Sequence, residues 1–425
     1  QCSGTLNIYG VKKAYQGSCS TILSSSVCKK SRIIAENGET IYSLANLGGI
    51  KMLAITNGHI ITMEGTEYNC GTLLVRDGVI QQVGDNIDIP EHAQVYDIKG
   101  KYLMPGMIDS HCHLGVSQDL QSLEAEREFM DDYILPNLRV IDAINSQAVG
   151  FAAAREAGIT SVAVSPGSTC VVGGQIAVVK TLAGVVDHIV LREPAALKMA
   201  LGEIFTYRGL HREPTTQARM MVTASLREAF VRAENYARED KDLDLSMDII
   251  IQAKRGRLPV FVHARRADDM MTALRLAREF SLDLVIVHGN ECENIANYLV
   301  NYEVPVVISP ISYNKADDPE SIDWSNLARL EASGLKIAFC TDYPIMPIGS
   351  LRGFAVKAHE AGFSREASLA AITINGASIL DVDDEVGSLA EEKEADFVIL
   401  DGDPLKAESK VLEVWIKGHR VFERE

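Results

Sequence analysis

The sequence predicts an α/β fold, a (β/α)8 barrel of the TIM-like type, and three observations carry that prediction. Apolar runs in the segments 258–263, 282–288 and 335–342 are typical of parallel strands that are buried on both faces. The segments between these runs have helical periodicity, as at residues 267–280 and 324–333. Each run also leads into a histidine or an aspartate, and the C-terminal ends of barrel strands meet at one mouth, where catalytic residues lie.

Residues 104–114 are expected to contain a short apolar strand that ends in two histidines one residue apart. Successive side chains of a strand point to opposite faces, so His111 and His113 project into the same pocket while Cys112 faces the other way. Such a pair occurs both in metal sites and among hydrogen-bonded core residues. Three later runs that also close on a histidine or an aspartate favour the metal site.

The next elements continue the alternation of strand and helix. A polar, acidic connection at residues 121–132 precedes a predicted helix at residues 138–157, which Gly158 terminates. A strand at residues 160–164 then leads into the loop at residues 165–168, which is expected at the mouth of the barrel.

His263, His288 and Asp342 each follow an apolar strand at the point where the mouth is expected. The alternatives are a hydrogen-bonded core role for the histidines and a helix N-cap for the aspartate. Imidazole and carboxylate ligands suit zinc first, with manganese or iron(II) as other choices. A bound divalent ion lowers the pKa of water from about 15.7 to about 7. Asp342 can then act as general base toward that water and as general acid toward a leaving amine.

The order His-x-His, acidic residue, His, His, Asp, with Pro-Gly-Met-Ile-Asp-Ser before it, resembles the amidohydrolase superfamily of metal-dependent hydrolases. The resemblance covers about residues 52–422, because residues 387–404 also look like the strand and turn with which such chains return to a small β-domain. Residues 198–203 and 263–269 look most like the imidazolonepropionase-related branch. The resemblance implies a hydrolase of a C–N bond in a cyclic amide, an N-acyl compound or a small peptide-like molecule.

The resemblance also implies a fifth ligand, for which Lys198 and Glu203 are candidates, since some relatives bridge two metals through a carboxylated lysine and others use a glutamate. Their odd separation places them on opposite faces of a strand, with Lys198 about 16 Å before Glu203 at about 3.3 Å per residue. If the strand runs through Leu201, Glu203 reaches the mouth and Lys198 does not. The expected ligands of one or two ions are therefore His111, His113, Glu203, His263, His288 and Asp342.

Substrate binding is expected from loops that follow predicted strands or lie close to the same face of the barrel. The candidate residues are Arg208, His211, Arg265 and Tyr313. Arginines at this face would suit a substrate with a carboxylate. The alternative role of Arg208, Arg265 and Arg266 is surface solvation, or pairing with Asp268 and Asp269. Relatives of the branch often have a histidine in place of Arg265, so the resemblance does not supply a substrate.

Three parts are expected along the chain. Residues 1–51 are Ser/Gly-rich and are interpreted as an extension, native or foreign to the enzyme, with a small added β-element as the alternative. Residues 52–104 alternate short strands with turns and are expected to form a β-sandwich domain together with residues 386–425. Residues 105–385 are expected to form the catalytic barrel.

Composition excludes several functions. The chain has 41 Lys and Arg against 58 Asp and Glu, a net charge of −17 that opposes binding to nucleic acid. It has no apolar run of about eighteen residues, so no membrane span is expected. Its eight cysteines have no paired spacing, which favours reduced thiols and a cytoplasmic enzyme. The expected partner is a small-molecule substrate, and a homo-oligomer is compatible with the sequence.

Two alternatives to an amide hydrolase remain at this stage. The same attack by a metal-activated water at an amidine-like carbon would release ammonia, which would make the protein a deaminase. A catalytically silent scaffold with the same barrel is the other alternative, and loss of ligands is its usual mark. Because the chain retains every proposed ligand and Asp342, the sequence favours an enzyme.

Overall fold

The computed structural model describes residues 5–8, 11–14, 52–116, 134–202, 216–238, 242–309 and 324–425 of the chain. The chain divides into two units, Gln1–Ile50 and Lys51–Glu425. In the first unit, β1 (Thr5–Ile8) and β2 (Val11–Ala14) pair as an antiparallel hairpin. The origin of this unit, as a native or a foreign extension, stays a prediction.

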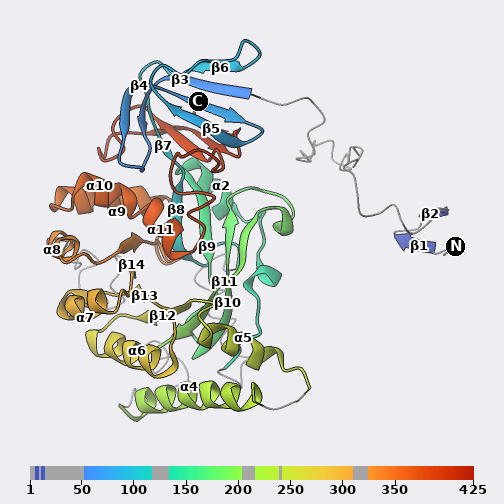
Figure 1. The fold of residues 1–425 in the computed structure, drawn as a ribbon, viewed down its shortest axis with the longest axis vertical. Helices are drawn as coiled ribbons and strands as arrows, with labels where there is room; N and C mark the ends of the chain where they lie inside the picture. The colour runs from blue at the N-terminus through green and yellow to red at the C-terminus, as the bar shows by residue number, and fades with distance from the viewer. Residues whose placement is uncertain are drawn as a thin grey trace. The chain divides into compact units, whose positions relative to one another are not determined.

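The second unit contains a nearly closed barrel of eight strands, ordered β8 to β15 around the sheet (Figure 1). Most of their residues are buried, as the continuous apolar runs predict. The strands are β8 (Met107–Cys112), β9 (Ile159–Val164), β10 (Val172–Lys180), β11 (Val190–Ala200), β12 (Val260–Ala264), β13 (Leu284–His288), β14 (Val306–Ile308) and β15 (Ile337–Phe339).

The expectation of eight parallel strands is wrong for β10. This strand pairs antiparallel with both β9 and β11, whereas β8 with β9 and each neighbouring pair from β11 to β15 are parallel. A parallel pair needs a crossover of about a dozen residues or more, usually a helix. The connections at residues 165–171 and 181–189 are shorter than that, so the chain turns back at each of them.

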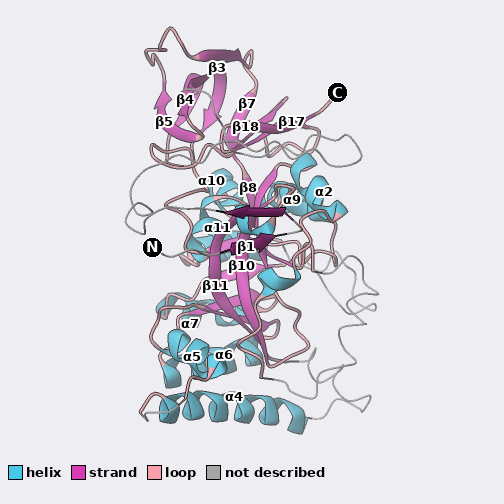
Figure 2. Cartoon of the chain, turned by 90° about the vertical axis from the view of Figure 1, so that its right-hand side faces the viewer, coloured by secondary structure: helices cyan, strands magenta, loops and turns pink. Residues whose placement is uncertain are grey.

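Helices cover the barrel from the outside. Helix α6 packs against β12 and β13, and α4 packs on α5 and α6 as a further layer (Figures 1 and 2). The predicted helix at residues 267–280 is confirmed, but the one at 138–157 begins only at residue 149. The helices are η1 (Val140–Ala143), α2 (Val149–Glu156), η2 (Val186–His188), α4 (Thr216–Tyr236), α5 (Leu245–Lys254), α6 (Ala267–Phe280), η3 (Cys292–Ile295), α7 (Ala296–Asn301), α8 (Asn326–Ala332), η4 (Ile348–Ser350), α9 (Leu351–Glu360), α10 (Arg365–Ala370) and α11 (Ile374–Ile379).

A second sheet joins segments from before and after the barrel. Its order is β18-β17-β16-β7-β3-β4-β5, with β6 paired to β3, so the two segments meet where β7 pairs with β16. These strands lie in one sheet, and the two-layered sandwich domain stays a prediction. The strands are β3 (Met52–Ile61), β4 (Glu67–Arg76), β5 (Val79–Gly84), β6 (Gln94–Asp97), β7 (Tyr102–Pro105), β16 (Phe397–Leu400), β17 (Val411–Ile416) and β18 (His419–Glu423).

None of the helices in the described ranges is long and apolar enough to cross a membrane.

Candidate metal centre

His111 and His113 project from the end of β8 toward Asp342. The Nε2 atoms of the two imidazoles lie 3.6 Å and 3.3 Å from Oδ1 of Asp342. One ligand atom from each residue can be chosen so that the three lie within 4.8 Å of one another, and all three residues are buried. Two imidazoles and a carboxylate at this spacing form a donor set of the kind that holds a divalent cation.

His263 and His288 bring two more imidazoles to the same place. His263 lies near the end of β12 and His288 ends β13, a neighbouring parallel strand. Their ring centroids are 4.2 Å apart, and the ring of His288 lies 5.6 Å from that of His111. The structure therefore gathers four buried histidines from three strands at one end of the barrel.

Two residues of this cluster have a backbone conformation that is unusual for a residue with a side chain. His288 has φ = 79° and Asp342 has φ = 52°, both in the left-handed region. Such residues cost about 1–3 kcal/mol each and persist where the surrounding structure holds them, often at functional sites. The backbone N–H of Asp342 donates to the carbonyl of His111 at 3.1 Å, which ties the two sides of the site together.

The loop after β9 contacts the outer ring nitrogens of two histidines. Nδ1 of His113 lies 2.7 Å from the carbonyl oxygen of Ser165, which can only accept, so Nδ1 carries a proton and Nε2 is the nitrogen left to bind a metal. The hydroxyl of Ser168 lies 3.2 Å from Nδ1 of His263. Contacts of this kind orient metal-binding imidazoles and select their tautomer.

Burial favours the neutral form of two histidines of the cluster, His111 and His288, by lowering the pKa of each. Desolvation, followed by the neighbouring cation Lys198, lowers the pKa of His111 well below its usual value. Desolvation and the neighbouring His263 do the same to the pKa of His288. Because only the neutral imidazole offers a lone pair to a metal, these residues fit the role of ligands at neutral pH.

Lys198 lies inside this cluster, contrary to the sequence-based expectation that it stops short of the mouth. The residue is fully buried, and its Nζ is 3.4 Å from Nε2 of His111. The expectation followed the position of the backbone alone, whereas the flexible four-carbon stem of lysine extends the reach of the amine. Desolvation lowers the pKa of Lys198 to about 8. Glu203, its competitor, lies outside the described residues.

Of the four expected substrate-binding residues, Arg208, His211 and Tyr313 lie outside the described residues. Arg265 is half-buried just after β12, and its Nε donates to Oδ1 of Asn290 at 3.0 Å.

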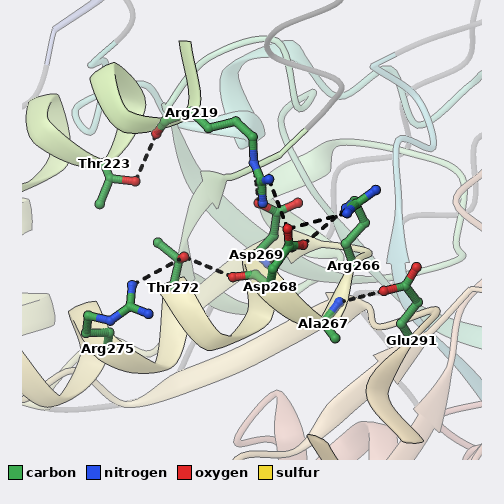
Figure 3. A network of polar contacts seen from close by, with 9 residues as sticks. All are labelled: Arg219, Thr223, Arg266, Ala267, Asp268, Asp269, Thr272, Arg275 and Glu291. Carbon is green, nitrogen blue, oxygen red and sulfur yellow. Dashed lines mark hydrogen bonds and ion pairs between the residues drawn. The ribbon is translucent and has the colours of Figure 1, made fainter. Parts of the chain in front are cut away.

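The arginine next in the chain pairs with a carboxylate, as the alternative interpretation held. Arg266 contacts Asp268 at 3.1 Å, and both side chains are about half exposed. A residue that the sequence did not indicate, Arg219 of α4, donates to both Asp268 and Asp269 of α6 (Figure 3). Because these partners are far apart in the sequence, periodicity within one helix gave no signal for the pairing.

Asp109 is another residue that the sequence analysis missed. It lies on β8 two positions before His111, and it is fully buried. Its carboxylate accepts hydrogen bonds from the backbone of His111 and from both the backbone and the hydroxyl of Thr341. Desolvation raises the pKa of Asp109 to about 7. The alternation of side chains along a strand would have placed it on the face of the two histidines.

Comparisons with known proteins agree with this architecture. The model of the amidohydrolase family matches residues 260–421. The solved structure of an amidohydrolase from Thermotoga maritima is 32% identical, with a TM-score of 0.81, and the match covers 88% of this chain and all of that one. A prolidase solved with N-methylphosphonate-L-proline is 18% identical with a TM-score of 0.60 over 88% of this chain and all of the prolidase, which shows the fold alone.

Sequence relatives give the same picture. The amidohydrolase tasK of Hapsidospora irregularis is 26% identical over 400 residues, which are 84% of this chain and 40% of that protein. The chain therefore spans about two fifths of the length of that relative. An imidazolonepropionase of Phocaeicola vulgatus is 38% identical over 76 residues, 15% of this chain and 18% of the enzyme.

Proposed function

This chain belongs to the amidohydrolase superfamily, and on that premise we propose that it is a metal-dependent hydrolase that cleaves the C–N bond of an amide or a cyclic amide. One observation carries the proposal: four buried imidazoles and the carboxylate of Asp342 meet at one end of the barrel strands. Catalytic residues of such barrels lie at the C-terminal ends of the strands. The short match to an imidazolonepropionase gives its branch only weak support.

The proposed metal ligands within the described ranges divide into two groups. His111, His113 and Asp342 would hold one ion, and His263 with His288 would contribute to a second. Zinc is the first choice for this donor set, with manganese or iron(II) as other choices. For the bridging position, Lys198 is now supported by its distance of 3.4 Å from His111, and Glu203 remains the alternative. A mass increase of a carbamate on Lys198 would decide between them.

When bound, a divalent cation supplies Lewis-acid activation of water and of a substrate carbonyl. Asp342 is placed to accept the proton of the attacking water and then to donate it to the departing nitrogen. Its burial excludes bulk water from that proton transfer, and its side chain faces the imidazoles of His111 and His113. Arg265, together with Arg208, His211 and Tyr313, is proposed to bind a carboxylate of the substrate.

The proposal is tested in two steps on the purified full chain. Metal analysis should find about one or two equivalents of zinc, manganese or iron, restored by added metal after treatment with a chelator. The loaded protein is then assayed against N-acyl amino acids, dipeptides, hydantoins, lactams and imidazolones, with release of amine and of ammonia measured separately. Less than a tenth of an equivalent of metal without rescue, or ammonia as the product, would contradict the proposal.

A further inference from the structure

The barrel sheet has two end strands, β8 and β15, and the path of hydrogen-bonded strand pairs does not return from one to the other. The junction between residues 108–113 and residues 339–343 is called the seam below. Asp342 lies on one side of the seam, and His111 and His113 lie on the other. What closes the seam therefore sets the distance between the carboxylate and the imidazoles.

At the level of Ile108 the two strands are bridged by a third segment. The backbone N–H of Phe339 donates to the carbonyl of Ala371 at 2.8 Å, and the N–H of Ile108 donates to the carbonyl of Ile372 at 2.9 Å. Two consecutive peptide groups before α11 thus take the place of a partner strand for both β8 and β15. This bridge contacts Ile108 and Phe339 and does not reach as far along the strands as His111 and His113.

At the level of the histidines, the carboxylate of Asp109 on β8 binds Thr341 on the other side of the seam. Its Oδ1 accepts hydrogen bonds from the backbone N–H of Thr341 at 3.1 Å and of His111 at 3.3 Å. Its Oδ2 accepts one from the hydroxyl of Thr341 at 2.5 Å. Asp109 and Thr341 are both fully buried, so these bonds are not exchanged with water. Two backbone bonds also cross the seam at this level, from the N–H of Asp342 to the carbonyl of His111 at 3.1 Å and from the N–H of His113 to the carbonyl of Tyr343 at 2.8 Å. The carboxylate of Asp109 adds three further bonds, two of them across the seam to Thr341.

The same hydroxyl also holds the residue beyond Asp342. The backbone N–H of Tyr343 donates to Oγ1 of Thr341 at 3.2 Å, and the carbonyl of Tyr343 accepts from the N–H of His113 at 2.8 Å. Asp342 itself, at φ = 52°, is in a conformation that a residue with a side chain adopts only when its surroundings impose it. Bonds to both of its neighbours in the chain supply that constraint.

We propose that Asp109 is a positioning residue, which acts through Thr341 to close the seam and to hold the carboxylate of Asp342 toward His111 and His113. A well-packed apolar side chain would fill this buried position without the desolvation of a charge, but it would accept no hydrogen bond. The consequence for metal binding rests on the proposed function, whereas the closing of the seam does not.

The test compares four forms of the protein: wild type, Thr341→Val, Thr341→Ser and Ser110→Ala. Valine keeps the shape of threonine and removes the hydroxyl, and serine restores it. Ser110 is the matched control, because it lies on β8 beside Asp109 and its buried hydroxyl has no hydrogen-bond partner within the described residues. Hydrogen exchange of the peptide at residues 337–345 is measured on metal-free protein, and zinc affinity is measured by competition with a chelator.

Thr341→Val should accelerate exchange at residues 341–343 on the order of tenfold. It should also weaken zinc binding about 10- to 100-fold, as expected for groups that orient metal ligands. Thr341→Ser and Ser110→Ala should match the wild type in both measurements. If Thr341→Val does not fold, Asp109→Asn replaces it, and the same changes are expected at a smaller size because asparagine keeps one acceptor oxygen.

The outcomes separate the two proposals. If Thr341→Val exchanges as slowly as the wild type and binds zinc as tightly, the role of Asp109 in the seam is overturned. Binding of zinc by the wild type would still support the proposed function. Accelerated exchange with unchanged affinity overturns the positioning of Asp342. If the wild type binds no zinc while Thr341→Val still exchanges faster, the proposed function fails and the closing of the seam stands.

Discussion

Asp342 has the properties that a carboxylate needs to carry a proton between water and a leaving nitrogen. It is 3% exposed, and its Oδ1 lies 3.3 Å from Nε2 of His113. The backbone is left-handed at this residue, shortly after β15 ends at Phe339, and the side chain faces the imidazoles of His111 and His113. The short segment after β15 thus sets the position, the burial and the direction of the Asp342 side chain.

The first prediction concerns this residue. Asp342→Asn keeps the size of the side chain and an oxygen that can face the metal, but it removes the ability to accept a proton. With metal in excess, kcat should therefore fall about 10²- to 10⁴-fold while most of the metal is retained. Turnover of the first substrate found in the panel and metal content are the two measurements. Asp268→Asn, in a half-exposed carboxylate on α6, is the control and should leave kcat unchanged. Near-normal turnover in Asp342→Asn would contradict the mechanism.

The second prediction concerns the loop after β9. Ser168→Ala removes the hydroxyl beside Nδ1 of His263, so metal affinity should fall about 10- to 100-fold. Ser165→Ala is the matched control, because the contact to His113 comes from the backbone carbonyl, which alanine keeps. Chelator competition on both variants measures the difference. Equal affinities would show that the hydroxyl does not orient the imidazole.

Side-chain alternation along one strand predicted that His111 and His113 share a face, and the structure agrees. The same rule applies to Asp109, two residues earlier, but its partner Thr341 is far away in the sequence and could not be predicted from alternation. Lys198 was misplaced because alternation locates a Cα atom but not the end of a long, flexible side chain. Contacts to Ser168 could not be foreseen, since they depend on how a loop folds over another strand.

At the scale of elements, α4 is held to α6 by ion pairs of two kinds. Arg219 bonds to Asp269, which is 4% exposed, whereas Arg227 pairs with Glu279 at 2.8 Å on the surface. Removal of one partner from a buried charge leaves that charge desolvated and unpaired, whereas an exposed pair contributes little. The two arginines lie on the same helix, so they form a matched pair for mutagenesis.

The third prediction follows from that contrast. Arg219→Ala should lower the free energy of unfolding by about 1–3 kcal/mol, and Arg227→Ala by less than about 1 kcal/mol. Denaturant unfolding of both variants at neutral pH measures the two values. Equal losses would show that Asp269 is solvated once its partner is removed.

Continuous apolar runs were enough to predict β12, β13 and β15, because strands buried on both faces need apolar residues throughout. They did not reveal the direction of β10, since a buried antiparallel strand has the same composition as a parallel one. The predicted helix at residues 138–157 is formed only from residue 149, and a short 3-10 helix at Val140–Ala143 with a loop takes the place of its first part. Length of the connection, not periodicity, is the signal that would have identified the reversal at β10.

At the scale of the whole molecule, Lys180 connects the barrel to the second sheet. Its Nζ lies 2.5 Å from Asp396 and 2.7 Å from Glu394, and the lysine is almost fully buried. Burial lowers the pKa of Lys180, but the two carboxylates outweigh it and raise the pKa above its usual value. The pairing of β7 with β16 could be foreseen from the resemblance of both chain segments to one β-domain, whereas this buried ion cluster could not.

The fourth prediction concerns this connection. Lys180→Met leaves two carboxylates without their shared cation, so it should cost about 3–5 kcal/mol of unfolding free energy at pH 7. Burial already raises the pKa of Asp396, and loss of the lysine removes the influence that lowers it. When a carboxylate has a raised pKa in the folded state, the folded protein gains stability as the pH falls through that pKa. The deficit of Lys180→Met against wild type should therefore shrink between pH 8 and pH 5, and a constant deficit would contradict the account.

The central claim is that side chains far apart in the sequence gather around a cation at one end of the barrel. X-ray diffraction from zinc-loaded crystals, recorded on both sides of the zinc absorption edge, tests it directly. The account predicts an anomalous peak about 2.0–2.2 Å from the imidazoles of His111 and His113. A protein that retains zinc but has its anomalous peaks only away from these residues would contradict it.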